Sequence, residues 1–493
     1  MGHLLGSARP RRGGDREACA RPARRVARRR HVRARPDQPF QAALARLPAD
    51  RRDARAPEPA DAVRDGRRLH GRRDRHQRGE RIAGIRRACV SAARPSANDG
   101  SEHERSATRK ETSMNRHHKT VFATAVALTC ALPAGAAQAD DVVRIGHVAP
   151  LTGAIAHLGK DSENGARLAV EEINAKGLVI GGRKVTLQLD AQDDAGDPRT
   201  ATQVAQRLVD DKVVGVVGHH NSGTSIPASR VYRDGGVVQI SQAATNPTYT
   251  QQGFKTTYRV VATDAQQGPA LAMYAAKNMG IRTVAVVDDS TAYGQGLATE
   301  FEKAAKAAGM KVVSRDATND KAIDFRAILT KIKGASPDAI MYGGMDATGG
   351  PLAKQARQLG MRAKILAGDG VCSTDLPKLA GPASDNVVCS EAGIALEKMP
   401  GGAAFAKRYE ARYHQPMQVY APFSYDAVYI IVDAMKRANS TDPAKVLAAM
   451  PATDYRGVIG ETSFTPQGDL KHGAISVFTY KSGRKALLDI VRM

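Results

Sequence analysis

The sequence predicts an α/β fold made of two doubly wound, mainly parallel-sheet lobes. Short runs rich in β-branched residues alternate with amphipathic helical stretches from residue 142 to 241, and the same alternation starts again at residue 282. Alternating strands and helices are typical of a parallel sheet with helices on both faces. The chain after residue 139 is also longer than one hydrophobic core usually supports, which favours two lobes over one.

The first unit is expected to begin with a strand and a long helix. Residues 142–148 form a β-branched run. The helix predicted over 162–176 places Ala166, Val170 and Ile173 on one face, with Gly177 after its end. The following elements alternate in the same way: a strand at 184–190, a helix at 200–211, a strand at 213–218, a helix at 225–234 and a strand at 237–241.

The second unit repeats this order. Its predicted elements are a strand at 282–288, a helix at 294–308, a strand at 311–315, a helix at 325–333, a strand at 338–342 and a helix at 348–359. Ligands of doubly wound folds bind at the carboxyl ends of the strands. Two such units in tandem therefore place the expected site in the cleft between them.

Residues 114–139 have the pattern of a bacterial secretory signal. A basic segment, Arg116 to Lys119, precedes an apolar run at 121–132, and Ala137-Gln138-Ala139 has the small-x-small form of a cleavage site. The apolar run is too short to span a bilayer. We therefore expect 114–139 to be a signal peptide and the mature protein to lie in the periplasm.

The segment before this signal differs in composition from the rest of the chain. Residues 1–113 are rich in Arg, show no apolar periodicity, and carry most of the formal net charge of +23. We interpret them as a disordered upstream extension that is not native to the protein. A basic arm for nucleic acid is the alternative, but Phe40 is the only aromatic residue available there for base stacking. No nucleic-acid partner is expected.

Only Cys372 and Cys389 remain after the signal, 17 positions apart. In an exported chain, two cysteines favour a single disulfide. Two separate buried thiols are the alternative.

The motifs that suggest an enzyme lack the context that catalysis needs. Gly294-Gln295-Gly296 follows a strand, but Thr299 stands where a dinucleotide fingerprint has its third glycine. His219 and His220 are adjacent on a turn and have no second cluster of metal ligands. The chain contains no G-x-S-x-G elbow and no P-loop. We therefore expect neither catalysis, nor a cofactor, nor a metal.

Small hydroxylated turns follow the predicted strands of the first unit. Ser222 to Ser225 opens a helix, and Ala243 to Asn246 follows the next strand. A helix N-terminus with nearby hydroxyls can bind a carboxylate. In the second unit Tyr293 and Asp369 come just after strands, and an unpaired carboxylate at the end of an apolar strand is costly. One lobe thus offers donors for an anion and the other a carboxylate for an ammonium, as an α-amino acid requires.

The sequence resembles a known family, the branched-chain amino-acid-binding proteins of bacterial ABC importers, which are type 1 periplasmic binding proteins. The resemblance covers residues 142–480. It rests on Ile145-Gly146, Pro150-Leu151-Thr152-Gly153, Glu171-Glu172-Ile173-Asn174, Val217-Gly218-His219, Pro227-Ala228-Ser229, Ala243-Ala244-Thr245, Tyr293-Gly294-Gln295-Gly296, Tyr342-Gly343-Gly344, Tyr425-Asp426-Ala427 and Gly468-Asp469-Leu470-Lys471.

The resemblance implies two lobes joined by three crossovers. Residues 140–261 and 391–470 are then expected in lobe 1, and residues 262–390 and 471–493 in lobe 2. It further implies an inner-membrane ABC permease complex as partner, a free amino acid (leucine, isoleucine or valine) as ligand, and a monomer.

The resemblance also implies a set of ligand-binding residues. Ser222, Thr245 and the backbone at Ala243 are expected to hold the α-carboxylate, and Asp369 the α-ammonium. Tyr293 and Tyr420 are expected to line the side-chain pocket.

The sequence departs from the family at several of these positions. Leu158 and Met345 stand where close relatives carry aromatic residues, although both still favour an aliphatic ligand. Gly196 and Asn221 replace the cysteines of the family's first-lobe disulfide. Two alternatives stay open: another small ligand on the same fold, such as an amide, an aromatic acid or urea, and a ligand sensor that docks on a signalling receptor.

Overall fold

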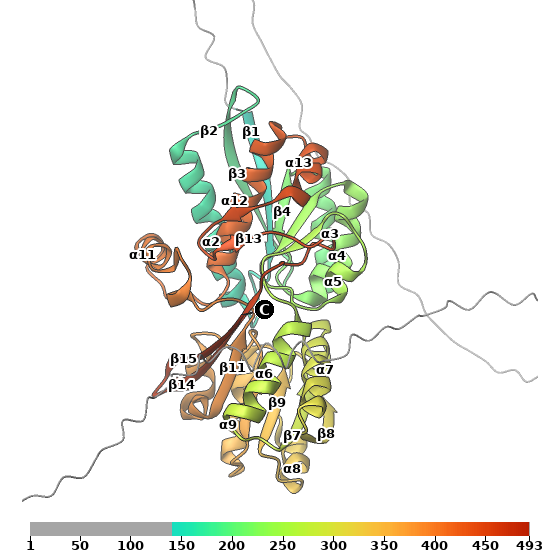
Figure 1. Cartoon of the computed structure of the whole chain (residues 1–493), viewed down its shortest axis with the longest axis vertical. Coiled ribbons are helices and arrows are strands. Elements are labelled where there is room, and N and C mark those ends of the chain that lie inside the picture. Colours follow the sequence, from blue (N-terminus) through green and yellow to red (C-terminus); the bar gives the residue numbers. More distant parts are fainter. Residues whose placement is uncertain (1–140, 493) are drawn as a thin grey trace, which may run out of the picture. The chain divides into compact units, whose positions relative to one another are not determined.

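The computed structural model describes residues 141–492. The expected upstream extension and the signal peptide lie outside these residues. Within them the chain forms two α/β lobes, each built on its own mainly parallel sheet (Figure 1). The predicted fold class is confirmed.

Lobe 1 is built on a six-stranded sheet in the order β2-β3-β1-β4-β5-β6. Only β2 runs antiparallel to its neighbour. Its strands are β1 (Asp141–Ala149), β2 (Leu178–Ile180), β3 (Arg183–Asp193), β4 (Gly215–Gly218), β5 (Val238–Ser241) and β6 (Thr257–Arg259). Its helices are α2 (Ala156–Lys176), α3 (Pro198–Asp210), α4 (Ser222–Gly235), α5 (Thr248–Gln251), α11 (Gly402–Tyr413), α12 (Ala421–Ala438) and α13 (Pro443–Ala449).

Lobe 2 is built on a seven-stranded sheet in the order β15-β14-β11-β10-β9-β7-β8. Its strands are β7 (Thr283–Asp288), β8 (Lys311–Ala317), β9 (Ala339–Gly343), β10 (Lys364–Ala367), β11 (Val387–Glu391), β14 (Ala474–Lys481) and β15 (Arg484–Arg492), of which β14 and β15 are antiparallel. Its helices are α6 (Asp264–Asn278), α7 (Ala292–Ala307), α8 (Arg326–Gly334), α9 (Asp346–Gln358) and α10 (Leu376–Ala380). A small ribbon of β12 (Tyr455–Arg456) and β13 (Glu461–Thr462) precedes the last passage into this lobe.

Helices cover both faces of each sheet. In β7, Ala285 and Val287 pack into one hydrophobic cluster with α8 and α9, whereas Val284 and Val286 pack into another with α6 and α7. A strand buried on both faces has apolar residues at consecutive positions. This burial explains why the parallel strands could be predicted from continuous β-branched runs.

The chain crosses between the lobes three times, after β6, after β11 and before β14. Hydrogen bonds tie these crossovers together. The Ala262 N–H donates to the Ala392 carbonyl at 2.8 Å, and the Ser476 hydroxyl donates to the Gly393 carbonyl at 2.8 Å. The hinge therefore consists of three short connecting segments that are joined to one another by hydrogen bonds.

Helix α2 begins at Ala156, six residues before its predicted start. Its N-cap residue Ile155 has no side-chain capping bond, so the sequence carries no start signal there. Further along, the helix approaches the start of α12 closely. A Cβ at Gly165 would lie 2.1 Å from the Ala421 carbonyl oxygen, so only glycine fits at this contact.

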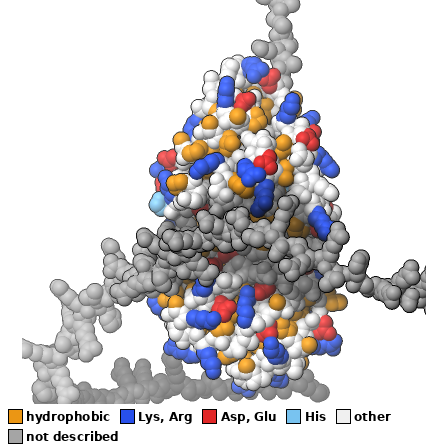
Figure 2. Space-filling model, turned by 90° about the vertical axis from the view of Figure 1, so that its right-hand side faces the viewer, with side chains coloured by type: hydrophobic (Ala, Val, Ile, Leu, Met, Phe, Trp, Pro, Cys, Tyr) orange, Lys and Arg blue, Asp and Glu red, His pale blue; other side chains and the backbone are white. Residues whose placement is uncertain are grey.

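Charged side chains of both signs are interspersed over the face of the molecule drawn in Figure 2. Among the helices of residues 141–492, none is long and apolar enough to cross a membrane.

Candidate ligand-binding site

Most of the predicted site residues lie on loops or in the first turns of helices that follow the carboxyl ends of parallel strands in both lobes. In lobe 1, Ser222 opens α4 after β4, and the loop at 242–247 follows β5. In lobe 2, Tyr293 lies in the first turn of α7 after β7, Met345 caps α9 after β9, and Asp369 follows β10. This is the edge at which doubly wound sheets bind ligands.

Asp369 is buried and receives three hydrogen bonds from uncharged groups. Its Oδ1 accepts from Gln267 Nε2 at 2.8 Å and from the Tyr293 hydroxyl at 3.0 Å. Its Oδ2 accepts from the Tyr420 hydroxyl at 2.9 Å, a bond that crosses from lobe 1. Burial raises the pKa of Asp369 above its ordinary value, and the three donors oppose that rise. Within residues 141–492 no cationic side chain pairs with this carboxylate.

The sequence did not reveal that the hydroxyl groups of these two tyrosines bind Asp369. Both were expected as walls of the side-chain pocket, and both also orient Asp369 through their hydroxyl groups. The Tyr293 hydroxyl in turn accepts from the Gly370 N–H at 3.0 Å, which fixes the turn that follows β10. The cost of burying Asp369 is thus partly offset before any ligand is present.

An apolar cluster lies next to these polar groups. Leu158, Ala243, Val419 and Tyr420 are buried against one another, and Met345 packs on them from lobe 2. The structure therefore brings six of the eight predicted residues, Asp369 included, into one group of contacts that spans both lobes. Val419 was not predicted, because it lies on an irregular segment before α12.

The loop at 243–246 is held by hydrogen bonds that leave one hydroxyl unused. The Ser241 hydroxyl accepts from the Ala244 N–H at 2.9 Å, and the Ser222 hydroxyl accepts from the Asn246 N–H at 3.2 Å. The Thr245 hydroxyl is fully buried and has no hydrogen-bond partner within residues 141–492. A buried donor without a partner is costly unless something else binds it.

Asp264, a second buried acid beside the site, was missed from the sequence. It is the first residue of α6, and its N–H donates to the Thr245 carbonyl at 2.8 Å. Neither of its carboxylate oxygens meets hydrogen-bond geometry with any described residue. Burial raises the pKa of Asp264 well above its ordinary value; the nearby Thr245 hydroxyl opposes this rise and the negative charge of Asp369 adds to it. The capping box of Thr263 and Gln266 marks this helix start in the sequence, but it does not reveal that Asp369 is near.

Side chains also connect the lobes at the edge of the site. His157 Nε2 of α2 lies 2.7 Å from Asp346 Oδ2 at the start of α9, and the Ser373 hydroxyl donates to the same oxygen. Burial lowers the pKa of His157, but Asp346, helped by Asp375 and Asp161, raises it overall above the ordinary value. Nearby, Asn246 Nδ2 donates to the Ala292 carbonyl of lobe 2 at 2.6 Å.

The two adjacent histidines do not form a metal site. His219 is paired with Asp194 at 2.8 Å, whereas His220 contacts Ser162 at 3.2 Å and packs edge-on against Tyr420. Burial lowers the pKa of His220 to about 3, so its ring is neutral. Among the described residues there is no group of three His, Cys, Asp or Glu side chains that could hold a metal ion.

The glycine pair in Gly294-Gln295-Gly296 has a packing explanation. A Cβ at Gly294 would lie 2.5 Å from the Gly343 carbonyl oxygen, so α7 can start against the end of β9 only with glycine here. Close packing, rather than a bound dinucleotide, therefore accounts for Gly294.

The predicted disulfide is present. Cys372 and Cys389 are bonded and fully buried, and they join the loop after Asp369 to β11. The bond anchors the segment that carries Asp369 to the centre of the lobe 2 sheet.

A separate cavity of about 660 Å³ lies between α11, the segment before α12 and lobe 2. Its lining includes Glu391, His414, Gln418 and Lys485, but none of the eight predicted ligand-binding residues. Glu391 and Lys485 already form an ion pair with each other. The predicted site at the strand ends is therefore separate from this cavity.

Two doubly wound lobes, a three-segment hinge and polar groups that converge from both lobes define a two-lobed ligand-binding protein. The chain belongs to the periplasmic binding protein family, whose model matches residues 142–485. The predicted family resemblance is confirmed.

Named relatives agree with this assignment. The Leu/Ile/Val-binding protein homolog 1 of Brucella melitensis is 35% identical over 74% of this chain and 97% of its own. The leucine-, isoleucine-, valine-, threonine- and alanine-binding protein of Pseudomonas aeruginosa is 33% identical over 70% of this chain and 91% of its own. A solved structure of the substrate-binding protein LivJ from Streptococcus pneumoniae, in complex with isoleucine, is 26% identical, covers 72% of this chain and 100% of its own, and superposes with a TM-score of 0.66.

Proposed function

We propose that this protein captures leucine, isoleucine or valine in the periplasm and delivers them to an inner-membrane ABC permease. The observation that carries the proposal is Asp369, a buried carboxylate with only uncharged donors around it. Asp264 lies close enough to interact with both Asp369 and the Thr245 hydroxyl, which meets hydrogen-bond geometry with none of the described residues. An α-amino acid brings an ammonium for Asp369 and a carboxylate for the Thr245 loop.

The carboxylate end of the ligand is assigned to lobe 1. The Ser222 hydroxyl already accepts a hydrogen bond from Asn246, so its own proton is available for an anion. Ser222 is also the first residue of α4, where free N–H groups and the helix dipole favour negative charge. Thr245 and the backbone at Ala243 complete this half of the site.

The side chain of the ligand is assigned to the apolar cluster. Leu158, Met345 and Tyr420 offer an aliphatic and aromatic surface that contains no charged atom, which suits a branched aliphatic group. Met345 can adapt to side chains of different shape. This composition supports leucine, isoleucine and valine as a group and does not favour one of them.

Ligand capture requires no covalent chemistry. Because the site draws on both lobes, only the closed arrangement offers all of its contacts, and the ligand shifts the protein toward that state. The protein acts as a monomer, reaches the periplasm through the signal at 114–139, and presents its closed form to the permease.

A thermal-shift screen of the purified protein tests this function. The chain has no Trp, so an external dye should report unfolding. A ligand at one hundred times its dissociation constant stabilises a protein by about 2.7 kcal/mol. We expect upward shifts with leucine, isoleucine and valine and none with sugars. Shifts with amides, aromatic acids or urea instead would support the alternative ligands, and equal shifts with sugars and amino acids would refute the proposal.

A further inference from the structure

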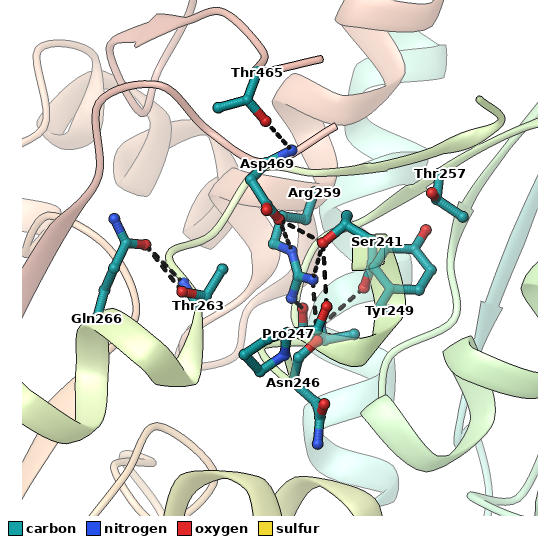
Figure 3. Close-up of polar contacts among 12 residues, drawn as sticks. Ser241, Asn246, Pro247, Tyr249, Thr257, Arg259, Thr263, Gln266, Thr465 and Asp469 are labelled. Carbon is teal, nitrogen blue, oxygen red and sulfur yellow. Dashed lines mark hydrogen bonds and ion pairs between the residues drawn. The ribbon is translucent and has the colours of Figure 1, made fainter. Parts of the chain in front are cut away.

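A buried arginine, Arg259, contacts the loop that carries Thr245, and Figure 3 shows it among its polar partners. Arg259 is the last residue of β6 and is fully buried. Its Nη1 donates to the Ala244 carbonyl at 2.6 Å and its Nη2 to the Asn246 carbonyl at 3.0 Å. The guanidinium thus binds the carbonyl groups on both sides of Thr245.

These two bonds complete the anchoring of the loop. The carbonyl of Thr245 itself is bound by the Asp264 N–H, and the N–H groups of Ala244 and Asn246 are bound by serine hydroxyls. Among the described residues, the Thr245 hydroxyl meets hydrogen-bond geometry with no partner, although the Asp264 carboxylate lies near it. The network therefore fixes the backbone around Thr245 and leaves its hydroxyl available.

Arg259 is in turn fixed by the chain segment that leads to the third crossover. Its Nε donates to Asp469 Oδ1 at 2.7 Å, and its backbone N–H donates to the Gly468 carbonyl at 3.0 Å. The Thr250 hydroxyl bridges the two side chains, since it accepts from Arg259 Nη2 and donates to Asp469, each at 2.9 Å. The centre of the Tyr249 ring lies 5.2 Å from the guanidinium carbon of Arg259.

We infer that Arg259 is a positioning residue for ligand binding: it holds the backbone at 244–246 so that Thr245 meets the ligand's carboxylate. This inference rests on the proposed function for the identity of the ligand. The planar, forked guanidinium is what allows two carbonyl groups to be held at once with Asp469 and Thr250. Lysine would keep the charge but cannot reproduce this geometry.

The test compares Arg259→Lys with Arg233→Lys in the full chain. Arg233 is a matched control because it lies on the surface of the same lobe, 45% exposed, and pairs with Asp234. Calorimetric titration with leucine should show at least tenfold weaker binding for Arg259→Lys and no change for Arg233→Lys. Leucine binding within threefold of wild type would overturn the inference.

Double substitutions separate positioning from a general loss of stability. If Arg259 acts through Thr245, then adding Arg259→Lys to Thr245→Ala should weaken binding little further, because the contact is already lost. Added to Asp369→Asn, Arg259→Lys should weaken binding by the same factor as it does alone in the wild-type protein. If Arg259→Lys weakened binding by its full factor in both double variants, Arg259 would be a merely structural residue, and the inference would be contradicted.

Hydrogen exchange of the ligand-free protein gives an answer that does not depend on leucine. In Arg259→Lys, peptides covering 242–250 should exchange faster, while peptides covering 339–345 in lobe 2 should not change. Unchanged exchange at 242–250 would overturn the inference. If wild type fails to bind leucine, the proposed function fails, yet this exchange result still decides the positioning of the loop.

Asp469→Asn is the second variant if Arg259→Lys does not fold. It removes the charge that fixes the guanidinium, at a side chain that is 27% exposed, and so loosens the group that holds the two carbonyls. It should show the same changes in binding and exchange as Arg259→Lys, in smaller degree. Wild-type binding and exchange in a folded Asp469→Asn would contradict the inference.

Discussion

In the proposed site, Asp369 is the single residue that would meet the charge of the ligand's ammonium. Two tyrosine hydroxyls and one amide lower the cost of burying its carboxylate, but they bring no positive charge. A buried ionised group without an opposite charge stays unfavourable. The arrangement therefore favours a ligand that carries an ammonium.

Replacing Asp369 with Ala should weaken leucine binding by roughly 2–5 kcal/mol, the usual cost of truncating one partner of a buried charge pair. Asn should cost less, because it keeps an acceptor. Calorimetric titration checks both variants against Asp385→Ala, an exposed acid of the same lobe. Binding of leucine by Asp369→Ala within about threefold of wild type would mean that the ammonium is held elsewhere.

The sequence predicted single residues only as far as local patterns reach. Asp369 and Thr245 were found because each follows an apolar strand. Asp264 and Val419 were missed because what brings them to the site is the packing of segments far apart in the chain. Their hydrogen-bond partners and burial depend on that packing, which no local pattern encodes.

At the scale of elements, α2 and α9 meet across the lobes through His157 and Asp346. The negative charge of Asp346 favours the protonated form of His157 only while the two helices are together. Closure should therefore be coupled to proton uptake by this histidine.

Ligand affinity should consequently depend on pH. Contact with Asp346 raises the pKa of His157. The contribution of this contact to ligand affinity is therefore fully present below the ordinary histidine pKa of about 6.5, and it is lost as pH rises through the raised value. For a partly exposed pair the effect is about 1 kcal/mol or less, a several-fold change in affinity. Titrations with leucine from pH 6 to 9 should show it.

His157→Gln is the control for this pH dependence and should abolish it. Affinity is the right measurement, since His147 and His220 have pKa values lowered by burial to about 4 and about 3. Protonation of these two buried histidines reduces the overall stability of the protein as pH falls below 6.5, but both histidines lie within lobe 1. A pH profile that is the same in wild type and His157→Gln would show that the contact does not assist closure.

The disulfide is the second contact that matters at this scale. It closes a loop with a sequence separation of 17, which contributes about 3 kcal/mol in the chain-entropy model. Reduction should lower the melting temperature while the stoichiometry with leucine stays at one. Titration of free thiols in oxidised, unfolded protein should find none from Cys372 and Cys389, and two reactive groups would contradict the bond.

Elements were predicted best where burial is simplest. Strands such as β7 are covered on both faces, so their apolar runs are continuous and easy to recognise. The start of α2 was placed too late because Ile155 provides no cap. The antiparallel pair β14 and β15 was not predicted, because its position beside β11 depends on the third crossover rather than on local pattern.

At the scale of the whole molecule, the proposed function divides ligand binding between the lobes. The loop proposed to bind the carboxylate belongs to lobe 1 and Asp369 to lobe 2, while the apolar cluster takes residues from both. A ligand that carries both charges gains contacts with both lobes only when they close. A ligand that lacks either charge gains only part of this energy.

The most direct test of this account compares leucine with two analogues that each lack one charged group. The analogues are 4-methylpentanoate, which has no ammonium, and isoamylamine, which has no carboxylate. In calorimetric titrations we predict tight binding of leucine with a stoichiometry of one, and at least hundredfold weaker binding of both analogues. Binding of either analogue within about tenfold of leucine would contradict the division of the amino acid's charges between the two lobes.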